Sequence, residues 1–142
     1  AKEFIDQYFE LRQPIRKFID DTLSKARTEG YVETYHGRRR PTPDITSSNS
    51  MVRAGAERAA ANMPIQGTEA DLMKLAMLKV DEKLGDLGEQ VLQIHDSILV
   101  ECPKKNADKV AEILRSTMEA IAPELKIALR VDVSTGKSWG EL

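Results

Sequence analysis

Residues 90–101 limit the choice of fold more than any other part of this chain. Two β-rich arms, 91–94 and 97–100, flank the polar pair His95-Asp96. Two such arms around a short polar pair predict a tight hairpin of two buried strands. Aspartate tolerates the left-handed backbone of such turns, so Asp96 is either only a turn residue or a carboxylate that the rigid hairpin presents to a divalent metal.

The first 30 residues predict two helices. Apolar side chains recur at helical spacing on both sides of Pro14, which suits the first turn of a helix, and Gly30 suits its C-terminal stop. Residues 31–35 then alternate in polarity and lead through His36-Gly37 into three arginines. This pattern predicts a small β-hairpin whose return arm is basic: Arg38, Arg39 and Arg40.

The middle of the chain predicts two further helices. Residues 51–62 are rich in alanine, a strong helix former, and Arg58 and Asn62 stand four residues apart on one face. We expect Pro64 to break or kink this helix. Thr68, with Asp71 three residues later, predicts a capping box that starts a second, mostly buried helix ending near Gly85.

The C-terminal third predicts a helix and a strand. After the His-Asp hairpin, Pro103 and Asn106 open a helix that Pro123 ends, and residues 125–133 alternate as in a half-buried strand. The predicted fold class is α+β, an antiparallel sheet with packed helices, preceded by a helical segment and a small β-hairpin. We place a subdomain boundary near residue 48.

Composition excludes several classes of protein. With 142 residues, 41% hydrophobic and 31% charged, the chain fits one globular domain rather than a disordered or fibrous one. The sequence has no apolar run of membrane-spanning length and no secretory pattern, so we expect no membrane partner and a cytoplasmic location. A net charge of −2 argues against a general cationic coat for nucleic acid. The single Cys102 is expected to fill space.

Basic and amide side chains nevertheless gather between residues 36 and 66. Arginine, asparagine and glutamine bond base edges and sugars, so Arg58, Asn62 and Gln66 near a helix break could line the minor groove of a duplex. The alternatives are a solvated charged loop for residues 38–40 and a surface salt bridge for Arg58. Taken together, the residues favour nucleic-acid binding.

A set of short motifs supports this interpretation: Gly37-Arg38-Arg39-Arg40, Pro43-Asp44, Glu57-Arg58, Asn62, residues 64–68, Ala70-Asp71 and residues 93–96. In order and spacing they resemble the C-terminal part of the polymerase domain of family A DNA polymerases, the bacterial DNA polymerase I type. The resemblance covers essentially the whole chain. It implies that residues 1–48 belong to the fingers subdomain and residues 49–142 to the palm.

The resemblance also implies roles for individual residues. Asp96 would be one of two palm aspartates that hold catalytic Mg²⁺ ions, and His95 would lie beside the primer terminus. The partners would be primer–template DNA and deoxynucleoside triphosphates, joined by two-metal nucleotidyl transfer, for which oxygen ligands suit Mg²⁺. Primer–template contacts would come from Arg58, Asn62, Gln66, Arg38, Arg39 and Arg40.

Two departures from the family pattern matter. Ser97 stands where members commonly have glutamate, and nothing here matches the family's other catalytic aspartate. We therefore expect the isolated chain to be inactive without the remainder of the polymerase domain. A truncated palm would leave sheet edges open to self-association. The resemblance also implies a cytoplasmic protein associated with the bacterial nucleoid. The alternatives are a non-catalytic DNA-binding or interaction module and, less favoured, a metal-dependent hydrolase centred on Asp96.

Overall fold

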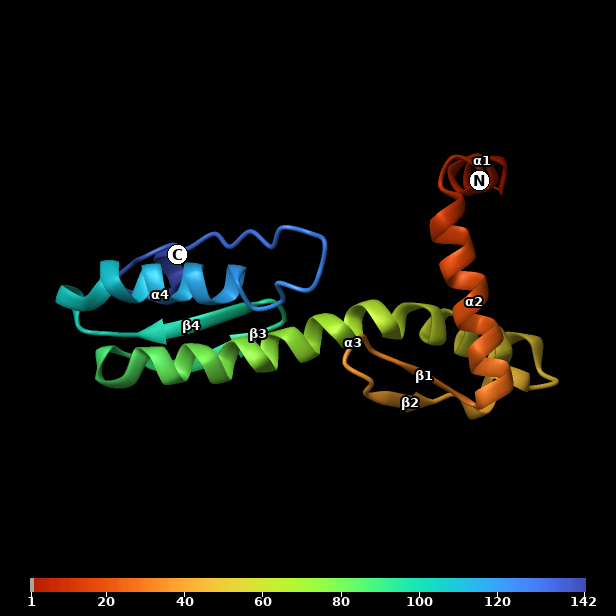
Figure 1. The fold of residues 1–142 in the computed structure, drawn as a ribbon, viewed down its shortest axis with the longest axis horizontal. Helices are drawn as coiled ribbons and strands as arrows, with labels where there is room; N and C mark the ends of the chain where they lie inside the picture. The colour runs from red at the N-terminus through yellow and green to blue at the C-terminus, as the bar shows by residue number, and fades with distance from the viewer. Residues whose placement is uncertain (1) are drawn as a thin grey trace. The chain divides into compact units, whose positions relative to one another are not determined.

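The computed structural model describes residues 2–142 and divides the chain into two compact units, Ala1–Thr68 and Glu69–Leu142. Each unit combines helices with one two-stranded antiparallel sheet, which confirms the α+β prediction (Figure 1). Every helix among the described residues is too short or too polar to cross a lipid bilayer. The division between fingers and palm at residue 48 stays a prediction.

The first unit begins with α1 (Lys2–Leu11) and α2 (Gln13–Glu29), as predicted. Pro14 lies in the first turn of α2, where its missing N–H leaves no helical carbonyl unpaired. Gly30 caps the other end in the left-handed region with φ 77°, and its N–H donates to the carbonyl of Ala26 at 3.0 Å. Local signals alone thus set both boundaries of α2.

The predicted basic hairpin consists of β1 (Tyr31–Glu33) and β2 (Arg39–Pro41). Val32 is 1% exposed and belongs to a core that β1, α2 and α3 share. A short 3₁₀ helix, Pro43–Thr46, adds Ile45 to this core. The hairpin is thereby held against α3 (Ser50–Leu84) by the buried residues Ala26, Val32, Ile45, Ala60 and Met63.

The predicted break at Pro64 is wrong, because α3 runs without interruption from Ser50 to Leu84. A proline inside a helix costs about 3 kcal/mol. Packing outweighs that cost here, since Met63 is buried before the proline, and Ala76 and Val80 are buried after it. The capping box at Thr68 is wrong for the same reason: its hydroxyl donates back to the Pro64 carbonyl within the helix.

The second unit contains the end of α3, β3 (Glu89–Ile94), β4 (Ser97–Glu101) and α4 (Ala107–Glu119). As predicted, α3 ends before Gly85, which has φ 47°, and the His-Asp pair joins two antiparallel strands. The core holds Val80 and Leu84 of α3 and Val110 and Leu114 of α4, with Ile98 and Val100 of β4 packed against it.

Strand β3 is less buried than predicted. Gln90 pairs with Val100 and Leu92 pairs with Leu99, so Val91 is an extra residue in a β-bulge. Val91 and Leu92 are 48% and 40% exposed, respectively. The prediction of two buried strands is therefore wrong for β3, because none of its residues packs against the cores of this unit.

The strand predicted over residues 125–133 does not form; these residues run without ladder hydrogen bonds. Their burial still follows most of the predicted alternation: Leu125, Leu129, Val131 and Val133 are half-buried between exposed residues, and Ile127, at 65% exposure, is the exception within this segment. A side chain replaces a strand partner at one position, because the N–H of Val131 donates to Glu119 Oε1 at 3.2 Å.

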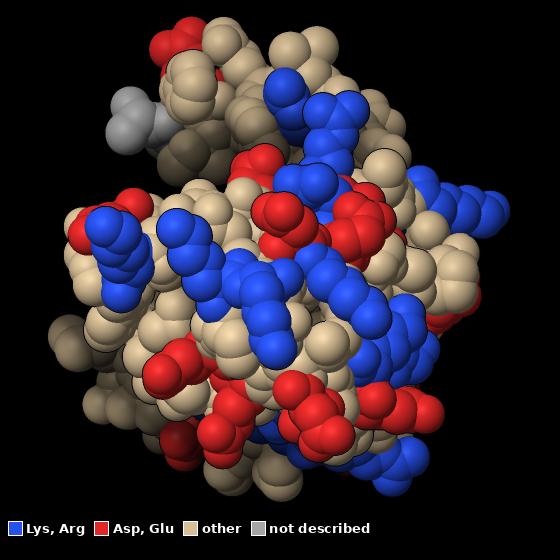
Figure 2. All heavy atoms as spheres, turned by 90° about the vertical axis from the view of Figure 1, so that its left-hand side faces the viewer, with Lys and Arg blue, Asp and Glu red and all other residues tan. Residues whose placement is uncertain are grey.

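Charges on the second unit are mixed in sign. Figure 2 shows lysine, arginine and acidic side chains interspersed over the face that carries the end of α3 and the start of α4. Such a surface has no single sign to attract a polyanion. The concentration of basic groups is found instead on the hairpin of the first unit.

Candidate nucleic-acid interface and carboxylate turn

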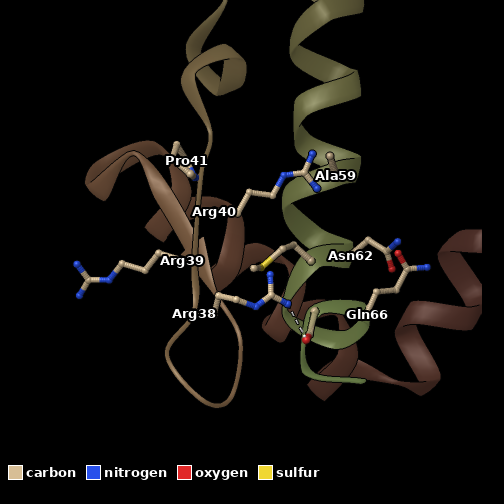
Figure 3. A pocket seen from close by; sticks show the side chains of 9 residues that line it. Arg38, Arg39, Arg40, Pro41, Ala59, Asn62 and Gln66 are labelled. Carbon is tan, nitrogen blue, oxygen red and sulfur yellow. Dashed lines mark hydrogen bonds between the residues drawn. The ribbon is translucent and has the colours of Figure 1, made fainter. Parts of the chain in front are cut away.

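The register of β1 and β2 decides where each of the three arginines points. Val32 pairs with Arg40 and Glu33 pairs with Arg39, so the side chains of Val32 and Arg40 share the face that packs toward α3. Figure 3 shows the Arg40 guanidinium reaching α3 beside Ala59, whereas Arg39 points away. Alternation along one short strand thus separates two neighbouring arginines.

Arg38 is anchored to the helix backbone. Its Nη2 donates to the carbonyl of Gly67 at 3.0 Å, and its own N–H donates to Thr34 Oγ1 at 3.1 Å (Figure 3). Thr34 is buried at 4% exposure, and its N–H donates to the Arg38 carbonyl at 2.9 Å. These bonds close the hairpin loop and fix the base of the Arg38 side chain.

Gly67 allows this close approach. A Cβ at position 67 would lie 2.7 Å from Thr34 Cγ2 and 3.3 Å from Arg38 Nη2. The next residue adds a bond between the same elements, because the N–H of Tyr35 donates to Thr68 Oγ1 at 2.9 Å. Sequence reasoning missed the role of Gly67; a glycine inside a helical stretch was the signal that could have found it.

Arg39 has partners on the other face of the hairpin. Its Nε lies 3.5 Å from Glu33 Oε2, and its guanidinium lies 4.4 Å from the centre of the Tyr31 ring. Glu33 also accepts a hydrogen bond from Lys25 of α2. That bond, with the charges of Lys25 and Arg39, holds the pKa of Glu33 below its usual value.

Three of the predicted DNA-contacting residues lie on one exposed stripe of α3. Arg58, Asn62 and Gln66 follow one another at intervals of four residues, and all three are exposed. Asn62 and Gln66 extend from successive turns close to each other (Figure 3). Arg58 lies one turn earlier and makes no ion pair with any described residue, so the surface salt bridge expected as its alternative role does not form.

Hairpin and helix together enclose an open pocket of about 500 Å³. Guanidinium groups offer donors from one wall, and the amides of Asn62 and Gln66 offer both donors and acceptors from the other. This combination suits phosphate and sugar oxygens as well as base edges. The lining residues are Arg38, Arg39, Arg40, Pro41, Ala59, Asn62, Met63, Gln66 and Gly67.

The predicted catalytic pair lies at the tip of the β3–β4 hairpin in the second unit. Strand β3 ends at Ile94, which pairs with Ser97, so His95 and Asp96 alone make the turn. Both are exposed, and His95 has φ 51° in the left-handed region. A side chain in that region costs about 1–2 kcal/mol. The turn therefore keeps a strained residue beside the carboxylate.

Asp96 provides one carboxylate of the type that Mg²⁺ prefers. Among residues 2–142, no group of three or more histidine, cysteine, aspartate or glutamate side chains could hold a metal ion. Asp96 is therefore a suitable ligand for magnesium, but the described residues do not provide enough ligands to hold the ion. The same finding leaves the metal-dependent hydrolase without its second cluster of ligands.

Comparison with known proteins identifies the family. The sequence model described as DNA polymerase family A matches residues 1–141. DNA polymerase I of Deinococcus radiodurans is 46% identical over 140 residues, and the thermostable DNA polymerase I of Thermus aquaticus is 45% identical over 140 residues; each match covers 98% of this chain. The chain belongs to the family A DNA polymerases.

A solved structure supports the same assignment. The POL domain of Pol1 from M. smegmatis, in complex with a DNA primer-template and dNTP, matches with a TM-score of 0.91 and 40% identity over 98% of this chain. The chain spans 25% of that domain's chain. It spans 14% and 17% of the length of the Deinococcus and Thermus aquaticus polymerases, respectively.

Proposed function

We propose that this chain is a fragment of a template-directed DNA polymerase that supplies primer–template contacts and one metal-binding carboxylate. The observation that carries the proposal is the pocket that Arg40, Asn62 and Gln66 line together, in a chain that belongs to the family A DNA polymerases. The hydrogen-bond donors and acceptors of the pocket complement those of a nucleic-acid backbone and minor groove.

The DNA contacts divide by chemistry. Arg58, Asn62 and Gln66 on their common stripe of α3 contact sugars and minor-groove base edges near the primer end. Arg38 and Arg40 face the same pocket and bind phosphate oxygens. Arg39 also borders the pocket, but its guanidinium points away from α3 and contributes charge from the far side of the hairpin. In this proposal the fingers subdomain comprises residues 1–48 and the palm residues 49–142.

In the catalytic part of the proposal, Asp96 is a magnesium ligand and His95 lies beside the primer terminus. With further ligands from the remainder of the domain, a magnesium ion held by Asp96 would supply activation of the primer hydroxyl and neutralisation of the charge on the incoming triphosphate. Because one carboxylate leaves the ion hydrated, the remainder of the polymerase domain provides the other ligands, and the isolated chain is inactive. The protein would work on DNA at the bacterial nucleoid.

The test is primer extension with Mg²⁺ and all four nucleotides. We expect no extension by this chain alone and extension when a fragment carrying the upstream half of the domain is added. In the reassembled polymerase, Asp96→Asn should keep primer–template affinity but abolish extension, because the amide has nearly the same shape and lacks the charge. Extension by the isolated chain, or near-normal extension by Asp96→Asn, would refute the assignment.

A second candidate function is a non-catalytic module that grips DNA or a protein partner. The observation that favours it is the lone carboxylate, since the described residues provide no complete metal site. Salt dependence tests the DNA part of this candidate, because the logarithm of the affinity for duplex DNA falls by about 0.9 per logarithmic unit of salt for each phosphate contact. Salt-dependent binding without extension by the reassembled domain would favour the module. Sedimentation of the chain would test self-association in either case.

A further inference from the structure

The direction of the Asp96 carboxylate depends on the backbone conformation of the two-residue turn that carries it. His95 is the only residue other than glycine with positive φ among the described residues, so Asp96 has a negative φ. A type I′ turn needs positive φ at both central residues, so this turn is not of type I′. A rotation of the peptide between His95 and Asp96 that brought Asp96 to positive φ would give a turn with positive φ at both positions. That rotation would turn the carboxylate in a new direction.

One side chain holds the peptide that distinguishes these forms. Gln93 Nε2 donates to the carbonyl of His95 at 2.6 Å. This carbonyl belongs to the central peptide of the turn, and rotation of that peptide would carry the oxygen away from the Gln93 amide. The hydrogen bond therefore favours the observed form, with negative φ at Asp96, over a form with positive φ at both residues.

A second side chain ties the ends of the turn together. Ser97 Oγ donates to the carbonyl of Ile94 at 2.8 Å, across the pair of residues that closes the hairpin. A hydroxyl group carries no charge to attract a cation, but it can donate to a backbone carbonyl, which a carboxylate cannot. Serine at this position thus stabilises the turn against opening and does not act as an ionic ligand.

We propose that Gln93 and Ser97 are positioning residues that hold the turn in one form and so direct the Asp96 carboxylate. The catalytic side of this inference rests on the proposed function, whereas the effect on the turn does not. Both side chains act through backbone carbonyls of the turn and touch no reacting group.

The first test measures the turn itself by NMR on the labelled 142-residue chain. The amide and α protons of one residue lie closer together at positive φ than at negative φ. The nuclear Overhauser effect between the amide and α protons of Asp96 should therefore be weak in the original chain, in which Asp96 has negative φ. It should become stronger in Gln93→Met and in Ser97→Ala, and Ser97→Thr, which keeps the hydroxyl, should restore the original intensity.

The second test uses the reassembled polymerase. Gln93→Met and Ser97→Ala should raise the Mg²⁺ concentration for half-maximal extension by about two- to tenfold, with primer–template affinity unchanged. Gln90→Met is the matched control, because Gln90 also extends from β3 but donates to the carbonyl of Met77 in α3. We expect this control to leave the Mg²⁺ dependence unchanged.

The outcomes separate the two proposals. An amide-proton signal and a Mg²⁺ dependence that both stay as in the original chain would overturn the inference about Gln93 and Ser97. An Asp96→Asn polymerase that still extends primers would overturn the proposed function, and the NMR result would then still decide whether the two side chains hold the turn.

Discussion

The two hairpins of this chain have similar lengths but are stabilised differently. The β1–β2 loop has a glycine, Gly37, in the left-handed region with φ 80°, and the hairpin is bonded to α3 through Gly67 and Thr68. At the tip of β3–β4 the left-handed residue is His95, and only side chains of the hairpin itself bond the turn. The loop of the first hairpin is thus held by bonds to α3, and the turn of the second by bonds within the hairpin itself.

This difference follows from what each hairpin presents. The β1–β2 hairpin offers several arginines to a pocket shared with α3, so its position against the helix determines the site. The β3–β4 hairpin offers one carboxylate at an exposed tip, so the conformation of two residues determines the site. Substitutions should therefore act through packing at the first hairpin and through backbone conformation at the second.

We expect the largest loss of stability from Gly67→Ala, and Gly55→Ala in the same helix is the variant with which it is compared. Both changes gain helix propensity, but the new Cβ at position 67 would lie 2.7 Å from Thr34 Cγ2, whereas the one at position 55 would meet only the end of Arg58 at 3.9 Å. Urea unfolding should show Gly67→Ala to be less stable than Gly55→Ala by about 1–3 kcal/mol.

Hydrogen exchange locates this effect. In Gly67→Ala the amide of Tyr35, which donates to Thr68, should exchange faster, while the amides of α4 keep their protection. Equal stability of the two alanine variants would mean that the hairpin is not fixed by its contact with α3.

The next largest effect is a difference between Arg40→Ala and Arg39→Ala in the affinity of the protein for primer–template DNA. Arg40→Ala should weaken binding by about 1–3 kcal/mol and reduce the salt slope by about one unit, because Arg40 faces the pocket. Arg39→Ala should change the affinity less, since Arg39 lies against Glu33 and Tyr31. Fluorescence anisotropy at several salt concentrations measures both, and a larger loss for Arg39→Ala would place the DNA on the other face.

Local sequence signals predicted the ends of elements better than their middles. Pro14 and Gly30 act within one helical turn, so they marked α2 correctly. Pro64 failed as a signal because residues on both sides of it are buried, and this packing is not visible in a local pattern. Alternation over residues 125–133 predicted which side chains are half-buried, apart from Ile127, but the strand itself does not form because no other strand pairs with these residues.

The candidate sites show the same limit. Spacing by four residues predicted correctly that Arg58 and Asn62 share a face of α3. It could not predict that Arg40 faces the helix while Arg39 faces away, which depends on the register of β1 and β2. The bonds from Gln93 and Ser97 to the turn depend on side-chain conformation, which the sequence pattern does not contain.

A smaller effect tests the left-handed residues of the two hairpins directly. Gly37→Ala should cost about 1–2 kcal/mol of unfolding free energy, because nothing lies within 4 Å of the new Cβ and the only penalty is the backbone conformation. His95→Ala should change stability by less than about 0.5 kcal/mol, because the strain is already present with histidine. Urea unfolding measures both variants, and similar costs would show that His95 is not strained.

The smallest effect concerns pH and the ion pair of the first hairpin. Lys25 donates to Glu33, which lowers the pKa of Glu33 and raises the pKa of Lys25. Glu33 therefore adds stability above its ordinary pKa of about 4.3, and this part is lost as pH falls through the lowered value. Lys25 adds stability below its ordinary pKa of about 10.4, and this part is lost as pH rises through the raised value.

Glu33→Gln is the matching variant, because the amide keeps the shape of the side chain and removes its charge. Urea midpoints of the original chain should lie slightly above those of Glu33→Gln at neutral pH, and the two should converge in acid as Glu33 is protonated. A gap that persists at pH values well below the ordinary pKa of glutamate would mean that the difference between the two chains does not come from the charge of Glu33.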